Sequence, residues 1–295
     1  MQMNRLTKLV LSVGAVGILA ACDPGATAGD DATGEVSGTI NVVSREDGSG
    51  TRGAFTEITG VLAEDENGEE VDNTYSEAVI QNGTEGVLSA VAQDQNAIGY
   101  ISLGSLNDTV RGLPVDGVEP TAETVQDGTF PIARNFNIAW AGDLSEVAQD
   151  FVDYIQSAEG QEIATEEGYV EAVSDAPAYE SKGLSGTISV VGSTSVSPLM
   201  EVLSEGYREL NPDVQIDITS NGSSAGMTSA IEGTADIGMA SRELNDTEKE
   251  KLTFEPIAID GIAIVVNKNN DIDSLTLEEV RQVFSGEITN WEDVQ

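Results

Sequence analysis

The chain of 295 residues is 39% hydrophobic, which suits a globular protein with two α/β lobes of ordinary size or one large domain. Its 52 Asp and Glu residues outnumber 13 Lys and Arg residues and give a formal net charge of −39, so its surface repels nucleic acid. The absence of histidine from the sequence excludes Ser-His-Asp and Cys-His nucleophile systems. Because the acidic residues are scattered, we interpret them as an adaptation to a saline habitat rather than as a chemical site.

The first 37 residues are expected to be a leader and a tether rather than part of the fold. Two cations precede an apolar stretch at 9–21 that is too short for a permanent membrane span and is typical of a signal peptide. Small residues then precede Cys22, the single cysteine of the chain, which favours a lipidated cysteine over an ordinary signal peptide with a chance cysteine. We therefore expect a signal peptide at 1–21 and a lipid-anchored tether at 22–37, on the extracellular face of the cell membrane.

Strand and helix signals alternate after the tether, which is the pattern of α/β architecture. In chain order we expect strands at 39–43, 97–101 and 137–140, a helix at 144–155, a strand at 187–191, a helix at 196–210, a strand at 214–218 and a helix that contains Met227 and Ile231. Thr276 and Glu279 have the spacing of a capping box and predict the start of a last helix.

Two of these strands lead into small polar turns that precede helices. The strand at 39–43 is followed by Arg45 and by Ser49-Gly50-Thr51, and the strand at 187–191 is followed by Thr194-Ser195. Free backbone N–H groups and the positive end of the helix dipole make such helix starts suitable for anions. The pair of turns therefore predicts two lobes that close on one small anion.

A third small polar turn, at 221–226, contains Ser223. Arg45, Arg52 and Arg242 all lie in or beside these turns, although a surface arginine in a loop is the usual interpretation of each one alone. Other chemistries lack their signatures, because no Gly-Lys-Ser/Thr loop, no Ser-x-x-Lys and no complete calcium loop occurs in the sequence. We expect a binding protein with no catalytic residues, no cofactor and no metal, although sequence alone does not exclude a pair of carboxylates for hydrolysis.

Read together, the turns and their neighbours resemble the substrate-binding lipoproteins of high-affinity phosphate ABC transporters. The matching segments are 44–52, 192–198, 221–226, 235–244 and 286–291, within a similarity that runs from about residue 38 to residue 295. In that family the segment that matches 44–52 follows the one that matches 286–291, whereas here it comes near the start of the chain. The order therefore predicts a circular permutation, in which residues 174–186 link the two positions that are the chain termini in that family. A fragment of a tandem gene is the alternative.

The resemblance implies an α/β, two-lobed periplasmic-binding-protein-like (type II) fold with the ligand in a cleft between the lobes, which two crossover strands connect. The lobes would comprise residues 135–262 (lobe A) and residues 38–134 with 263–295 (lobe B). It also implies that a monomer binds inorganic phosphate outside the cell and delivers it to membrane permease subunits. A receptor for another tetrahedral oxyanion (sulfate or molybdate), a phosphate-ester hydrolase and a signalling sensor are the alternatives.

Carried over residue by residue, the resemblance places phosphate on groups from both lobes. They are Thr194, Ser195 and Ser223 from lobe A and Arg45, Ser49, Gly50 and Thr51 from lobe B. Some relatives carry an Asp that accepts a phosphate proton and rejects sulfate, where this chain has Ser241 or, with one gap, Arg242. Asp260 or Asp47 is then the candidate acceptor, and without one the discrimination against sulfate should weaken. Asp47 is also expected to hold Arg45 in place.

Overall fold

The structure is a computed structural model that describes residues 36–65 and 68–294, so the predicted signal peptide and Cys22 lie outside the described residues. Its strands are β1 (Asn41–Arg45), β2 (Leu62–Glu64), β3 (Glu70–Asp72), β4 (Val79–Gln81), β5 (Ala97–Ser102), β6 (Val110–Leu113), β7 (Ala133–Trp140), β8 (Val170–Glu171), β9 (Gly186–Gly192), β10 (Val214–Ser220), β11 (Ile237–Ala240) and β12 (Thr253–Asn267). Its helices are α1 (Gly50–Thr59), α2 (Gly83–Gln93), α3 (Ala122–Gln126), α4 (Glu146–Ile155), α5 (Ala158–Glu166), α6 (Ser197–Leu210), α7 (Ser223–Glu232), α8 (Asp246–Lys249) and α9 (Leu277–Ser285), with 3-10 turns η1 (Leu103–Ser105) and η2 (Trp291–Asp293). None of the helices in the described part of the chain is long and apolar enough to cross a bilayer.

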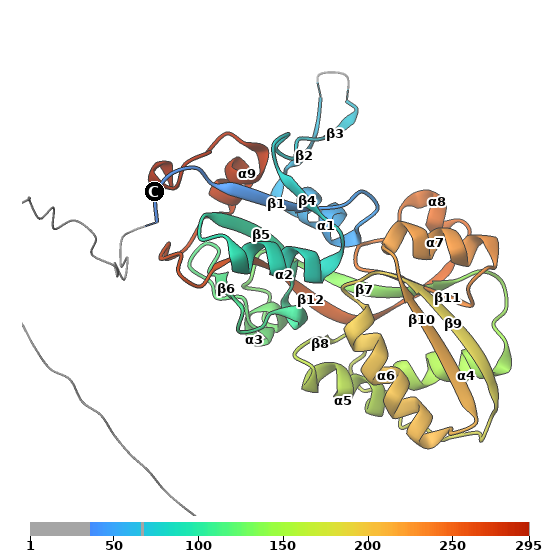
Figure 1. Ribbon diagram of the computed structural model, residues 1–295. Helices are drawn as coiled ribbons and strands as arrows, with labels where there is room; N and C mark the ends of the chain where they lie inside the picture. The colour runs from blue at the N-terminus through green and yellow to red at the C-terminus, as the bar shows by residue number, and fades with distance from the viewer. Residues whose placement is uncertain (1–35, 66–67, 295) are drawn as a thin grey trace, which may run out of the picture. The chain divides into compact units, whose positions relative to one another are not determined.

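Ten of the strands form one sheet that extends through both lobes (Figure 1). Its main path runs in the order β10-β9-β11-β7-β12-β5-β1-β4, and β6 and β8 also pair with β12. The central strands β7 and β12 are antiparallel and connect the lobes, because β12 pairs with β7 from Thr253 to Gly261 and with β5 from Ile262 to Val266. This arrangement is the two-lobed α/β fold that the sequence predicts.

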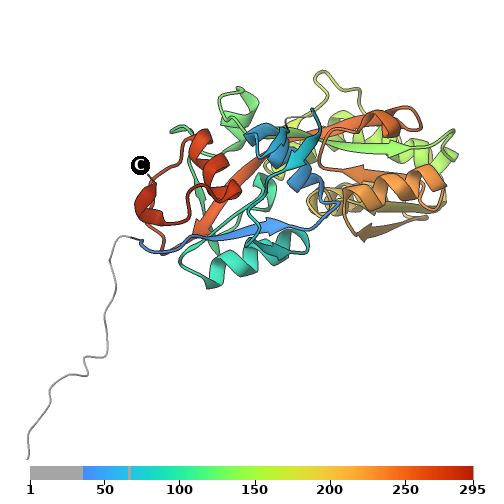
Figure 2. The same cartoon turned by 90° about the horizontal axis from the view of Figure 1, so that it is seen from above.

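Each lobe has its own hydrophobic core, and Figure 2 shows the two lobes side by side. In lobe A, α4 and α6 pack on the sheet through a buried cluster that includes Phe151 and Tyr207, and α7 packs through a smaller cluster around Met227. In lobe B, α1 and α9 pack through a cluster that includes Phe55, and α2 packs through a separate cluster around Val87. Burial of these apolar faces is what stabilises each lobe separately.

The predicted strand–turn–helix units are present with small shifts. The strand predicted at 39–43 is β1, displaced by two residues because Thr39 pairs with Asn290 in an isolated bridge instead. Ser49 caps α1, and the predicted capping box begins α9. Strand β12 has 15 residues and is longer than any strand that the sequence predicts.

The two ends of the described fold lie next to each other. The N–H of Ile40 donates to the carbonyl of Thr289 at 2.8 Å, and the N–H of Trp291 donates to the carbonyl of Gly38 at 3.0 Å. The predicted link at 174–186 lies on lobe A, where the hydroxyl of Tyr179 donates to the buried carboxylate of Asp150 at 2.6 Å. The first and last segments of the described residues therefore lie side by side in lobe B, and the segment 174–186 lies on lobe A.

Candidate functional site

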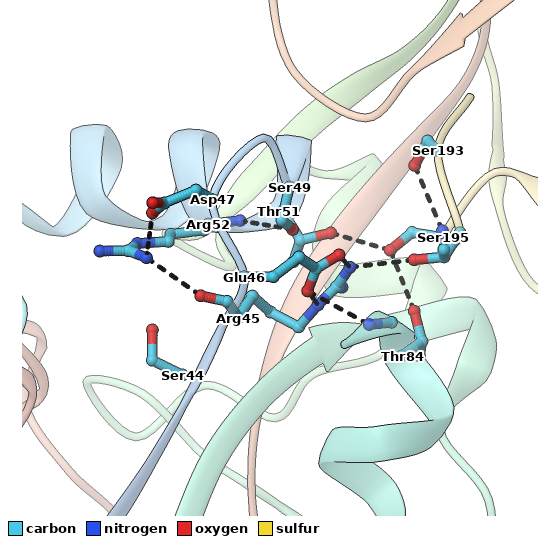
Figure 3. A network of polar contacts seen from close by, with 12 residues as sticks. Ser44, Arg45, Glu46, Asp47, Ser49, Thr51, Arg52, Thr84, Ser193 and Ser195 are labelled. Carbon is cyan, nitrogen blue, oxygen red and sulfur yellow. Dashed lines mark hydrogen bonds and ion pairs between the residues drawn. The ribbon is translucent and has the colours of Figure 1, made fainter. Parts of the chain in front are cut away.

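Arg45 ends β1, and only 1% of its surface is exposed. Its Nε and Nη2 donate to the two carboxylate oxygens of Glu46 at 2.7 and 2.8 Å, and Nη2 also donates to the hydroxyl of Thr194 in lobe A at 2.9 Å (Figure 3). Nη1 is buried and has no hydrogen-bond partner among the described residues. A buried donor without a partner is costly, so a ligand that offers Nη1 a hydrogen-bond acceptor would be stabilised here. An anionic oxygen makes the strongest such hydrogen bond.

Glu46 holds Arg45, so the prediction that Asp47 does so is wrong. The turn after β1 directs Asp47 to solvent, where its side chain is 99% exposed and accepts from Arg52 Nη1 at 2.9 Å. Glu46 is only 21% exposed, and the N–H of Gly83 also donates to its carboxylate at 3.2 Å. Burial raises the pKa of Glu46, but the hydrogen bond and the charge of Arg45 outweigh burial and lower the pKa below its ordinary value of 4.5.

Buried hydroxyl groups from both lobes meet beside this ion pair. The hydroxyls of Thr51 and Ser195 share a hydrogen bond of 2.8 Å, and the hydroxyl of Thr84 lies 3.3 Å from the same Ser195 oxygen. Thr84 is missing from the predicted site. Its signal in the sequence is weak, since it stands after Asn82-Gly83 at the start of α2, a small polar turn like the others but without a strong strand signal before it.

Serines line the wall that lobe A presents to α1. Ser193 donates to the hydroxyl oxygen of Ser241 at 2.8 Å, and the N–H of Ser241 donates to the hydroxyl oxygen of Ser223 at 3.1 Å. Gly50 of lobe B packs directly on this wall, because a Cβ at Gly50 would collide with Ser223 and lie 2.8 Å from the oxygen of Ser241. Below, "site hydroxyls" means those of Thr51, Thr84, Ser193, Thr194, Ser195, Ser223 and Ser241.

Four helices begin around the site hydroxyls, namely α1, α2, α6 and α7. The first turn of each helix has N–H groups without intrahelical partners and carries the positive end of the helix dipole. One of these groups already bonds to the other lobe, since the N–H of Ser224 donates to the carbonyl of Gly48 at 3.1 Å. The site therefore combines one buried cation with hydroxyl and amide donors, which suits a small oxyanion.

Arg242 and Asp260 have other partners in the structure. The guanidinium of Arg242 donates to both carboxylate oxygens of Glu248 at 2.7 and 2.8 Å. Asp260 accepts from Arg134 at 3.0 Å with one oxygen and from Ser102 at 2.9 Å with the other. Burial raises the pKa of Asp260, and the charge of Arg134 offsets this only in part. Within the described residues, neither side chain forms a hydrogen bond with the site hydroxyls.

Comparison with known proteins decides the family. A family model described as the PBP superfamily domain matches residues 27–159 and 177–295. The chain is 52% identical over 292 residues to phosphate-binding protein PstS 2 of Streptococcus pneumoniae serotype 4, across 98% of this chain and 99% of that protein. The chain belongs to the PstS family of the PBP superfamily. PstS 2 of Streptococcus agalactiae serotype V is 44% identical over 281 residues, which cover 95% of this chain and 94% of the relative.

A solved structure supports the same assignment. The crystal structure of the phosphate-binding protein of a phosphate ABC transporter from Streptococcus pneumoniae matches with a TM-score of 0.71 and 55% identity, and the match covers 88% of this chain and 100% of that one. The predicted family and the two-lobed α/β fold are thereby confirmed. PstS proteins are binding proteins, so the prediction that the chain is not an enzyme is confirmed with them.

Proposed function

We propose that this chain binds inorganic phosphate between its lobes outside the cell and delivers it to the permease of an ABC transporter. The observation that carries the proposal is the buried Nη1 of Arg45, which has no partner among the described residues and lies beside hydroxyls from both lobes. The names of the PstS relatives support phosphate as the anion.

The proposed ligands of phosphate are Arg45, Ser49, Gly50 and Thr51 from lobe B and Thr194, Ser195, Ser223 and Ser241 from lobe A, with Thr84 added by the structure. Arg45 would donate through Nη1 while Glu46 keeps the guanidinium in place, and Gly50 would bring the first N–H groups of α1 close to the serine wall. Arg242 and Asp260 hold neighbouring segments and do not need to touch the ligand.

Because the donors come from both lobes, phosphate would stabilise the closed state relative to the open one. Closure would bend β7 and β12, the strands that connect the lobes, which is a hinge motion. We propose that the permease recognises the closed form, so that delivery depends on occupancy.

Calorimetric titration of the purified mature chain with phosphate, then with sulfate and molybdate, tests this function. Arg45→Ala removes a charge-assisted donor worth about 1.5–3 kcal/mol, so we expect phosphate affinity to fall roughly 10- to 150-fold. Arg208→Ala is the matched control, since Arg208 is exposed and donates to a carbonyl of its own helix. Binding of sulfate or molybdate without phosphate would favour another oxyanion receptor, and turnover of a phosphomonoester would favour a hydrolase.

We propose that Cys22 is lipidated and that 22–37 tethers the protein to the outer face of the membrane. Support comes from the single cysteine after small residues and from the polar composition of the tether. The intact mass of the membrane-extracted protein should show a diacylglyceryl modification, and Cys22→Ala should release the chain into the medium. Recovery of an unmodified thiol from the membrane fraction would contradict the proposal.

We also propose that the chain is a circularly permuted monomer with lobes at 135–262 and at 38–134 with 263–295. The contacts of Gly38 and Ile40 with Thr289 and Trp291 support this order, because a short loop could join these two segments of the described fold. A variant with those ends joined and a new opening within 174–186 should fold and bind phosphate as the natural chain does. Light scattering that shows an obligate dimer, with one site per pair, would favour the tandem-gene alternative.

A further inference from the structure

A groove of about 290 Å³ lies between the lobes beside α1, and none of the site hydroxyls lines it. Lobe B contributes Ala54, Glu57 and Ile58, which are three and four positions apart and so share one face of α1. Lobe A contributes Ile259 of β12 and Glu243, which follows β11. The groove therefore combines an apolar lining with one carboxylate from each lobe.

Neither of these carboxylates forms an ion pair within the part of the chain that the structure describes. The arginines of α1, of β7 and of the segment after β11 have other partners: Arg52 pairs with Asp47 and Asp72, Arg134 with Asp260, and Arg242 with Glu248. Glu57 and Glu243 are both exposed, and Glu243 accepts one hydrogen bond, from the side-chain amide of Asn135 at 2.9 Å. Both carboxylates can therefore still accept hydrogen bonds from a cation.

Glu57 stands at a position where its own helix disfavours an acid. It lies in the last turn of α1, which ends at Thr59 and has Gly60 as its C-cap. The negative end of the helix dipole favours a cation there, yet α1 has no basic residue in this turn. A residue that breaks a local rule in this way, without a compensating ion pair in the described residues, is expected at a functional position.

The width of the groove depends on the angle between the lobes. Helix α1 moves with lobe B and Glu243 with lobe A, whereas β7 and β12 are the strands that would bend between them. The hydroxyls of Thr51 and Ser195 share a hydrogen bond across the lobes at 2.8 Å, so the groove belongs to an arrangement in which the lobes are in contact. A partner that binds Glu57 and Glu243 together would therefore distinguish the closed state from an open one.

We propose that the permease recognises the closed protein at this groove, into which it inserts the side chain of a lysine or an arginine. The inference rests on the proposed function, delivery of phosphate to a permease. Such a side chain has an apolar stem, which would pack on Ala54, Ile58 and Ile259, and a charged head, which Glu57 and Glu243 would hold by charge-assisted hydrogen bonds. Because the two carboxylates belong to different lobes, closure brings both to the same cation.

The experiment measures binding of the full mature chain to its permease complex in lipid nanodiscs, with and without phosphate. Glu57→Gln and Glu243→Gln each remove a charge at nearly constant volume, and glutamine at 243 can still accept from Asn135. Each substitution weakens one charge-assisted hydrogen bond, so we expect the affinity of the phosphate-bound protein for the permease to fall about tenfold per substitution. Phosphate affinity, measured by calorimetry, and the unfolding temperature should keep their wild-type values.

The double variant Glu205→Gln, Glu209→Gln is the matched control, since both residues are exposed on α6 and neither lines the groove. Wild-type permease binding by the variant that carries Glu57→Gln and Glu243→Gln would overturn the inference. An equal loss in the α6 control would overturn it too, because general charge attraction would then explain the binding. A wild-type dimer that the groove variant loses would assign the groove to a second copy of the chain instead. Failure of the wild-type chain to bind phosphate, or to bind the permease at all, would overturn the proposed function.

Discussion

Replacement of Gly50 by alanine should weaken phosphate binding without unfolding the protein. Gly50 is the first residue of α1, and its backbone is outside the left-handed region, so alanine fits the local conformation. In a helix, alanine is favoured over glycine by up to about 1 kcal/mol. The substitution therefore stabilises lobe B by itself, and any loss of phosphate affinity must come from the contact of α1 with lobe A.

The size of the expected loss of phosphate affinity follows from the packing of Gly50 against Ser223 and Ser241. The new methyl group would collide with the Ser223 hydroxyl and lie 2.8 Å from the Ser241 oxygen and 3.0 Å from the Ser223 Cβ. Overpacking of a well-packed site typically costs about 1–3 kcal/mol. Since this cost falls on the closed state alone, phosphate affinity should fall roughly 5- to 150-fold.

Titration calorimetry measures the affinity, and thermal unfolding without phosphate measures the stability. Gly53→Ala is the matched control in the same helix, because its Cβ would lie 3.4 Å from the flexible Cδ of Arg242. We expect the control to keep wild-type affinity and both variants to keep the wild-type unfolding temperature or exceed it. Wild-type affinity in a folded Gly50→Ala protein would refute the close contact of α1 with the serine wall in the bound state.

Three further predictions concern the free energy of unfolding and are tested by urea denaturation. Asp260→Ala leaves Arg134 buried without its counter-ion and should lower the free energy of unfolding by about 3–5 kcal/mol, whereas exposed Asp108→Ala should change little. Thr276→Ala removes the capping box of α9 and should cost about 1 kcal/mol with phosphate affinity unchanged. The pKa of Glu46 is lowered in the folded protein, so ionised Glu46 stabilises the fold fully above the ordinary pKa of 4.5. This stabilisation is lost as the pH falls through the pKa of the folded state. The free energy of unfolding should therefore decrease over that range, and Glu46→Gln should make the decrease smaller.

The local parts of the site could be predicted from the sequence, because each is a strand, a turn and a helix start that are contiguous in the chain. Arg45, Thr51 and Ser195 were recognisable in this way, and the structure brings their turns together. Thr84 could not be found by the same reasoning, because only the fold brings it to Ser195, 111 positions away in the sequence.

The sequence also does not predict the direction in which each side chain points. Glu46 and Asp47 are adjacent acids beside one arginine, and composition alone cannot tell which of them pairs with it. The turn after β1 decides the matter by exposing Asp47, where Arg52 binds it. The pair of Arg134 with Asp260 was equally hidden, since it joins β7 to β12 across 126 positions.

The balance of charge at the site explains how so acidic a chain can hold an anion. The ion pairs around the first turn of α1 involve three arginines and four carboxylates, so they carry a net charge of −1: Arg45 with Glu46, Arg52 with Asp47 and Asp72, and Arg242 with Glu248. Net positive charge therefore cannot be the source of affinity. Salt screens the distant acids beyond roughly 10 Å at 0.1 M, whereas hydroxyls, helix N-termini and the Nη1 of Arg45 act at contact distance. Affinity then depends on a few donors at contact distance, and above all on the buried Nη1 of Arg45, rather than on the net charge of the site.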